Sequence, residues 1–248
     1  MKETDAIFAQ VAAARARAAA DPFCLRTSID TKAKVKIGLF SRRGKSRLPK
    51  PAAAPSGYPD MHPDAILVPF GVLEVSRGAE KIQQLNVLFG HSRETADFIV
   101  DGLKLWWLSR REHHQGVRRL MIELDHGPEI SSARTQFLKR LVEFADETGL
   151  EIELVSLPPY HSQYHPIERG WGVLEQHWNG ALLDTIETAL EWARSMIWRG
   201  VKSLVYEIKT TYERGVTLTP AAMRPIFQRL QRHAVLPKWS LVISPNSG

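Results

Sequence analysis

The stretch that decides the fold class is residues 117–160, VRRLMIELDHGPEISSARTQFLKRLVEFADETGLEIELVSLPPY. Its two ends, residues 117–125 and 150–157, are short apolar runs of the kind found in buried strands. Between them, residues 132–148 place apolar side chains at helical spacing, and Gly149 stands where such a helix ends. Strand, helix and strand in this order are typical of a layered α/β domain.

The flanking sequence extends the same pattern. The segments expected before it are a helix at 5–20, two strands within 25–40, a strand at 65–75 broken at Pro69, a short strand at 86–90 and an amphipathic helix at 93–109. Those expected after it are a helix beginning at Pro166, helices within 185–199 and 219–233, and a last short strand. We therefore predict an α/β fold with a mixed sheet flanked by helices.

Composition places the chain among ordinary globular proteins. Apolar residues make up 44% of its 248 residues and charged residues 24%. No apolar run is long enough for a membrane span, and the N-terminus lacks the apolar core of a signal peptide, so a cytoplasmic protein is expected. The single cysteine, Cys24, excludes an internal disulfide and a cysteine-based zinc site.

The positive charge is concentrated in one segment. Residues 31–59 hold eight basic side chains and no acidic one, while the whole chain has a net charge of only +6. A local basic patch is expected of a protein that binds the phosphate backbone of nucleic acid. The alternative is a solvated loop beside an edge strand, where lysines discourage unwanted pairing. Charge alone does not separate these two interpretations.

Three acidic residues stand at positions suited to a metal site. Asp30 lies within a predicted strand, Asp125 ends a strand, and Glu168 begins a helix. Ligand sites in such sheets form at strand ends and helix starts. In-line displacement at phosphorus is promoted by two divalent ions, which take carboxylate oxygens as ligands. Carboxylates gathered this closely repel one another, so the cluster is difficult to explain as structure alone.

The sequence around these acids resembles the DDE transposases of bacterial insertion sequences. It is most similar to the Rhodopirellula transposase DDE domain family and is related to the mariner-like transposases. The resemblance covers about residues 5–240. The matching blocks are SIDTKAKVKIG at 28–38, PFGVLEV at 69–75, ETADFIVDGLKLWW at 94–107, LDHGPEISSARTQFLKRLVEFADETGL at 124–150 and LPPYHSQYHPIERGWGVLEQHWNG at 157–180.

The resemblance implies an RNase H-like fold and a transposase that cleaves DNA and transfers strands at insertion-sequence ends. Asp30, Asp125 and Glu168 match the three catalytic acids, which would hold Mg²⁺, with Mn²⁺ able to substitute. The implied partners are double-stranded DNA, as terminal repeats and target, and a second copy of the chain in a homodimer; the implied location is the bacterial nucleoid. The residues expected to contact DNA are Lys32, Arg42, Arg43, Lys45, Arg47 and Arg169.

The family pattern also suggests a domain division. Residues 1–24 are expected to form a connector helix from an upstream DNA-binding region, and residues 25–248 the catalytic domain with C-terminal helices. Two alternatives stay open: a truncated or inactive remnant that only binds DNA, and another RNase H-like nuclease.

Several side chains near the acids have two interpretations. His126 and His165 replace asparagines that are common in the family, and neither matches a metal ligand of the pattern. Glu123 shares a strand face with Asp125 and is either a fourth acid or, more in keeping with its surroundings, the partner of an arginine. Trp171 is expected to pack its helix onto the sheet rather than to stack on a base.

Overall fold

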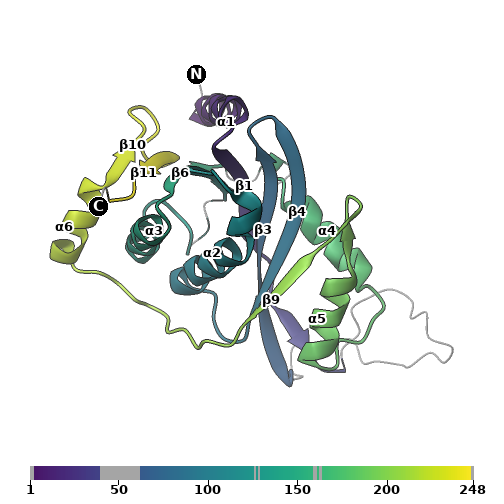
Figure 1. Ribbon diagram of the computed structural model, residues 1–248. Coiled ribbons are helices and arrows are strands. Elements are labelled where there is room, and N and C mark those ends of the chain that lie inside the picture. Colours follow the sequence, from purple (N-terminus) through teal and green to yellow (C-terminus); the bar gives the residue numbers. More distant parts are fainter. Residues whose placement is uncertain are drawn as a thin grey trace.

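A computed structural model describes residues 3–39, 62–125, 127, 129–158, 161 and 164–246 (Figure 1). The helices are α1 (Glu3–Ala20), α2 (Ala96–Arg110), the 3₁₀ helix η1 (Arg111–His114), α3 (Thr135–Thr148), α4 (Glu168–His177), α5 (Ile186–Ser195) and α6 (Pro220–Gln228). The long strands are β1 (Cys24–Thr31), β3 (Ala65–Arg77), β4 (Glu80–Gly90), β5 (Arg119–Leu124), β6 (Glu151–Ser156) and β9 (Leu204–Ile208). The short strands are β2 (Val35–Ile37), β7 (Ile197–Trp198), β8 (Val201–Lys202), β10 (Leu230–Arg232) and β11 (Ser240–Ile243).

One mixed sheet organises the molecule. Its strands follow the order β10-β11-β6-β5-β1-β3-β4-β9, with β2 added beside β3. β1, β3 and β4 are antiparallel neighbours, whereas β5 and β6 run parallel to β1. Helix α2 carries the chain from β4 to β5, and α3 carries it from β5 to β6. Strand order β4-β3-β1-β5-β6 with these directions is the RNase H-like arrangement, so the predicted fold class is confirmed.

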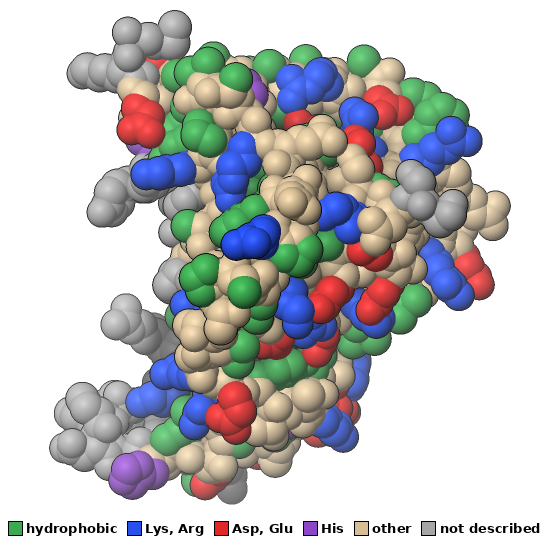
Figure 2. Space-filling model, turned by 90° about the vertical axis from the view of Figure 1, so that its left-hand side faces the viewer, with side chains coloured by type: hydrophobic (Ala, Val, Ile, Leu, Met, Phe, Trp, Pro, Cys, Tyr) green, Lys and Arg blue, Asp and Glu red, His purple; other side chains and the backbone are tan. Residues whose placement is uncertain are grey.

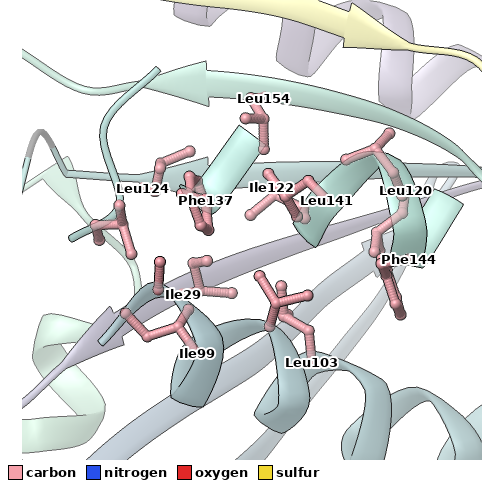
Figure 3. Packing of buried hydrophobic residues seen from close by; sticks show 14 of the residues in the cluster. Ile29, Ile99, Leu103, Leu120, Ile122, Leu124, Phe137, Leu141, Phe144 and Leu154 are labelled. Atoms are coloured by element: carbon pink, nitrogen blue, oxygen red, sulfur yellow. The ribbon is translucent and has the colours of Figure 1, made fainter. Parts of the chain in front are cut away.

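Helices cover both faces of the sheet. On one face, α2 and α3 pack against β1, β3, β5 and β6 (Figure 1). Figure 3 shows this layer closely: Ile29 and Ile122 of the sheet meet Leu103 of α2 and Phe137 of α3. The other face is covered by α4 and α5 over β3 and β4, and by α1 over β5 and β6. The predicted cap at Gly149 is confirmed, because its φ of 70° is left-handed and its N–H bonds to the carbonyl of Ala145.

Helix α1 is an integrated layer of this fold. Four of its apolar side chains are buried against the sheet: Ile7, Val11, Ala14 and Ala18. Arg17 pairs with Glu153 of β6, and the Gln10 amide donates to Ser240 of β11. A role of α1 as the connector from an upstream region stays a prediction.

The break expected at Pro69 is wrong, because β3 runs unbroken through it. The Pro69 carbonyl accepts from the N–H of Lys32, so the backbone polar groups of Pro69 face the place where β1 has just ended. The N–H that proline lacks therefore removes no bond from the ladder with β4. The strand expected at 86–90 extends back to Glu80 as the second arm of a hairpin, and β9 was missed. No helix in the described ranges is long and apolar enough to cross a membrane.

Candidate functional site

Three elements bring the predicted acids to one edge of the sheet. Asp30 is the penultimate residue of β1, Asp125 directly follows β5, and Glu168 is the first residue of α4. Because β1 and β5 are parallel neighbours, their carboxyl ends meet at the same edge. Asp30 and Glu168 offer ligand oxygens within 4.8 Å of each other, whereas Asp125 stands beside this pair, its side chain 37% exposed.

The position of α4 over β1 depends on close packing. Gly71 of β3 lies opposite Asp30 in the sheet register, and a Cβ there would lie 2.6 Å from Cδ1 of Ile167 and 2.7 Å from the ring of Trp171. The backbone N–H of Ile167 donates to Oγ of Ser28 over 3.3 Å. A bare glycine and a small hydroxyl therefore let the first turn of α4 lie directly on the strands.

Trp171 connects this packing to the site. It is buried, as expected of a side chain that packs α4 onto the sheet, and its Nε1 donates to Oδ2 of Asp30 over 3.0 Å. This bond orients the carboxylate of Asp30, which also interacts with the backbone of Thr31. The sequence predicted the packing of Trp171 but not its contact with the acid.

The electrostatics of the site favour a cation. Burial raises the pKa of Asp30 to about 7, with further contributions from the carboxylates of Glu168 and Asp125, and the Trp171 hydrogen bond only partly offsets them. Burial is the larger cause of this high pKa and the negative charge of the neighbouring carboxylates the second, and both disfavour the ionised form of Asp30. A divalent ion would relieve this repulsion, and the oxygen donors are of the kind that Mg²⁺ and Mn²⁺ take. The residues present therefore fit the expected metal.

His165 is the site residue whose role the sequence reasoning missed. Its side chain is fully buried, and a ring nitrogen lies within 4.8 Å of ligand atoms of Asp30 and Glu168. Nδ1 is 3.5 Å from Oδ1 of Asp125 and the ring also lies near the backbone of Glu123, but neither ring nitrogen makes a well-formed hydrogen bond to the described residues. Burial lowers the pKa of His165, although the neighbouring carboxylates oppose this. Its place three residues before Glu168 was the available signal.

Glu123 does not belong to the metal cluster. It is fully buried, and its carboxylate accepts from Arg15 of α1 and from Arg26 of β1. Burial alone would raise the pKa of Glu123, but these two guanidinium groups hold it below its usual value. The arginine-partner interpretation is thus confirmed. Arg15 also donates to the carbonyl of Tyr164, which ties α1 to the backbone just before His165.

The residues expected to contact DNA fall into three situations. Arg42, Arg43, Lys45 and Arg47 lie outside the described residues, as does His126. Lys32 is 13% exposed and pairs with Glu175 of α4, so DNA would have to compete with that carboxylate. Arg169, next to Glu168, is exposed.

Arg169 lines a cavity of about 370 Å³ beside the site. The cavity lies between α1, the β3–β4 hairpin, the start of α4 and the β7–β8 turn. Its basic side chains are Arg26, Lys81, Arg169 and Arg199, and its lining contains no acidic residue. Pro166 also lines it, so the cavity adjoins the segment that positions Glu168. Sequence reasoning named only Arg169 of this set, because the other three lie far from it along the chain.

Comparison with known proteins gives one strong match. The sequence model of the Rhodopirellula transposase DDE domain matches residues 1–245. Among solved structures, the Mos1 mariner paired end complex with Mn has 15% identity and a TM-score of 0.44, and the alignment covers 67% of this chain and 46% of that one. The Mos1 strand transfer complex has 11% identity and a TM-score of 0.40, with 76% and 50% covered. The chain thus spans about half the length of the Mos1 chains, and no curated protein sequence matches it. With nearly its whole length matched by the family model, the chain belongs to the Rhodopirellula transposase DDE domain family.

Proposed function

We propose that this chain is the catalytic domain of an insertion-sequence transposase, which cleaves DNA at the ends of the element and transfers the freed strand. Asp30, Asp125 and Glu168 are the proposed catalytic acids. The observation that carries this proposal is the convergence of Asp30 and Glu168, where burial of Asp30 and, second to it, repulsion by Glu168 raise the pKa of Asp30 to about 7. A binding module would have no need of so unfavourable a charge cluster.

Each residue has a distinct task in this proposal. Asp30 and Glu168 hold a divalent ion, expected to be Mg²⁺ with Mn²⁺ as a substitute, and Asp125 faces the same edge as a further ligand. Trp171 holds Asp30 in one orientation through the 3.0 Å bond to Oδ2. When bound, the metal supplies activation of the attacking water or 3′-hydroxyl and stabilisation of the leaving oxygen.

We further propose that duplex DNA reaches the site over the basic cavity. Arg169, Lys81 and Arg199 present cations beside the segment that carries Glu168, and phosphate contacts of this kind position DNA without reading its sequence. The face around α6 and the C-terminal strands differs from this cavity, because basic and acidic side chains lie side by side on it (Figure 2). A homodimer on paired ends, acting in the bacterial nucleoid, completes the proposal.

The first experiment is plasmid nicking by the purified chain with Mg²⁺ or Mn²⁺. Asp125→Ala and Asp30→Asn are the test variants, and Glu187→Gln is the matched control, since Glu187 is an exposed acid on α5 with Arg194 as its partner. We expect nicking by the wild type and the control, and its loss in both test variants. Wild-type protein that binds DNA but never nicks it would instead support the remnant that only binds DNA.

A second experiment tests the DNA-binding surface. Arg169→Ala removes a cation beside the site, whereas Arg224→Ala removes an equally exposed cation on α6. We expect the first to weaken duplex binding and to lower the slope of log K against log salt by about 1, and the second to leave both unchanged. Equal effects of the two changes would contradict the proposed surface.

A further inference from the structure

The buried imidazole of His165 needs an explanation that hydrogen bonding does not provide. It is 0% exposed, and neither of its ring nitrogens makes a well-formed hydrogen bond to the residues that the structure describes; its polar neighbours are the Asp125 carboxylate, 3.5 Å from Nδ1, and the backbone of Glu123. Buried polar groups in native proteins nearly always have a partner, and an exception signals a functional role, a water or an ion. Packing alone would be served better by an apolar side chain.

The direction of the imidazole supplies the explanation. One ring nitrogen, one oxygen of Asp30 and one oxygen of Glu168 lie within 4.8 Å of one another. Three donors at most 4.8 Å apart all lie within about 2.8 Å of one common point, whereas the N and O ligands of a small divalent ion lie about 2.0–2.2 Å from it. Each donor therefore needs to move by less than about 1 Å for all three to bind one ion.

The backbone around His165 is held firmly enough to keep this geometry. The His165 carbonyl accepts from the N–H of Glu168 over 3.2 Å, so the histidine and the acid belong to one tight turn. The N–H of Ile167 is held by Ser28, and the carbonyl of Tyr164 by Arg15. Bonds from β1 and α1 thus fix both sides of the residue.

We propose that His165 is a nitrogen ligand of the divalent ion held by Asp30 and Glu168, and that it increases the affinity of the site for Mn²⁺ relative to its affinity for Mg²⁺. The inference rests on the proposed function, because the ion is the one that would serve DNA cleavage. Mg²⁺ takes oxygen ligands almost exclusively, whereas imidazole nitrogen suits first-row transition ions. A site with two carboxylates and one imidazole is therefore less specialised for Mg²⁺ than a site with carboxylates alone.

The test is the environment of bound Mn²⁺ in the full chain without DNA. Electron spin-echo envelope modulation detects the ¹⁴N nucleus of an imidazole bound to Mn²⁺, independently of activity. We expect this modulation in the wild type and in the control His161→Asn, and its absence in His165→Asn. Titration with Mn²⁺ should show that His165→Asn binds the ion at least about tenfold more weakly than the wild type. Loss of a group that only orients a metal ligand already has an effect of this size. The loss of affinity for Mg²⁺ should be smaller.

Each outcome separates this inference from the proposed function. Mn²⁺ that binds to the wild type, is lost in Asp30→Asn and shows no ¹⁴N modulation overturns the role of His165 and leaves the metal site standing. An unchanged ratio of Mn²⁺ to Mg²⁺ affinity in His165→Asn overturns the claim of selectivity. Absence of Mn²⁺ binding in the wild type overturns both proposals. Because the ¹⁴N signal is read first in the wild type, a failure of the variant to fold does not decide the result.

Discussion

The contact between α4 and β3 makes Gly71→Ala an informative change. The new methyl group would lie 2.6 Å from Cδ1 of Ile167 and 2.7 Å from Cζ2 and Cη2 of Trp171, whereas carbon atoms pack best at about 3.5–4.0 Å. Both neighbours are buried, so neither can move into solvent. Relief of an overlap of about 1 Å requires α4 to lift from the sheet.

Two magnitudes follow from this geometry. Overpacking of a core typically costs about 1–3 kcal/mol, and 1 kcal/mol lowers the melting temperature of a protein of this size by about 2–4 °C. We therefore expect Gly71→Ala to melt about 2–12 °C below the wild type. A shift of α4 by about 1 Å also moves Glu168 relative to Asp30, and misplacement of this size lowers rates by about a hundredfold.

The assays are thermal unfolding followed by circular dichroism and metal-dependent plasmid nicking. Gly172→Ala is the matched control in the same helix, because a Cβ there meets nothing within 4 Å and alanine favours a helix over glycine by about 1 kcal/mol. It should raise the melting temperature and keep the activity. A Gly71→Ala protein that melts within 1 °C of the wild type would show that α4 does not lie on β3 as described.

Three further changes test other parts of the structure. Trp171→Phe keeps an aromatic side chain on α4 but removes the donor to Asp30; nicking should slow by about ten- to a hundredfold, since a hydrogen bond to a charged group contributes about 1.5–3 kcal/mol, while a rate equal to the wild type would exclude a role for this bond. Leu141→Ala, in the fully buried layer of Figure 3, should lower the free energy of unfolding in urea by about 2–5 kcal/mol, and a loss below 1 kcal/mol would contradict that packing. Glu74→Gln acts on a buried carboxylate whose pKa burial alone would raise, but which His114, Arg110 and Trp106 lower to about 2 from 4.5. The folded-state pKa is depressed, so the stabilisation is complete above pH 4.5 and is lost as pH falls towards 2. Its size is about 3.5 kcal/mol, at about 1.4 kcal/mol per pH unit. The wild type should thus exceed Glu74→Gln in urea stability at pH 7, and the difference should shrink below pH 4.5; a difference independent of pH would refute this account.

Much of the fold was predictable because local patterns agree with the tertiary packing. Short local patterns were enough to predict several elements. These are the buried strands β5 and β6, the amphipathic helix α3 and its cap at Gly149. The first half of β4 was missed because polar residues such as Gln83 and Gln84 interrupt its apolar pattern, and the five-residue strand β9 was missed as well. Those strands form because neighbouring strands complete their hydrogen bonds, which is information that a local pattern does not contain.

The sequence by itself determined the family and singled out the three acids that we propose as catalytic. Family motifs cover nearly the whole chain, and residues at strand ends and helix starts are recognisable from periodicity alone. Only the tertiary structure decided what surrounds those acids. It assigned Glu123 to Arg15 and Arg26 and placed the indole of Trp171 on Asp30. It also brought the buried imidazole of His165 within 4.8 Å of the carboxylates of Asp30 and Glu168. The physical reason is that distance and desolvation set the chemistry of a charged group, and both arise from segments that are remote in the chain and meet only when the sheet is assembled.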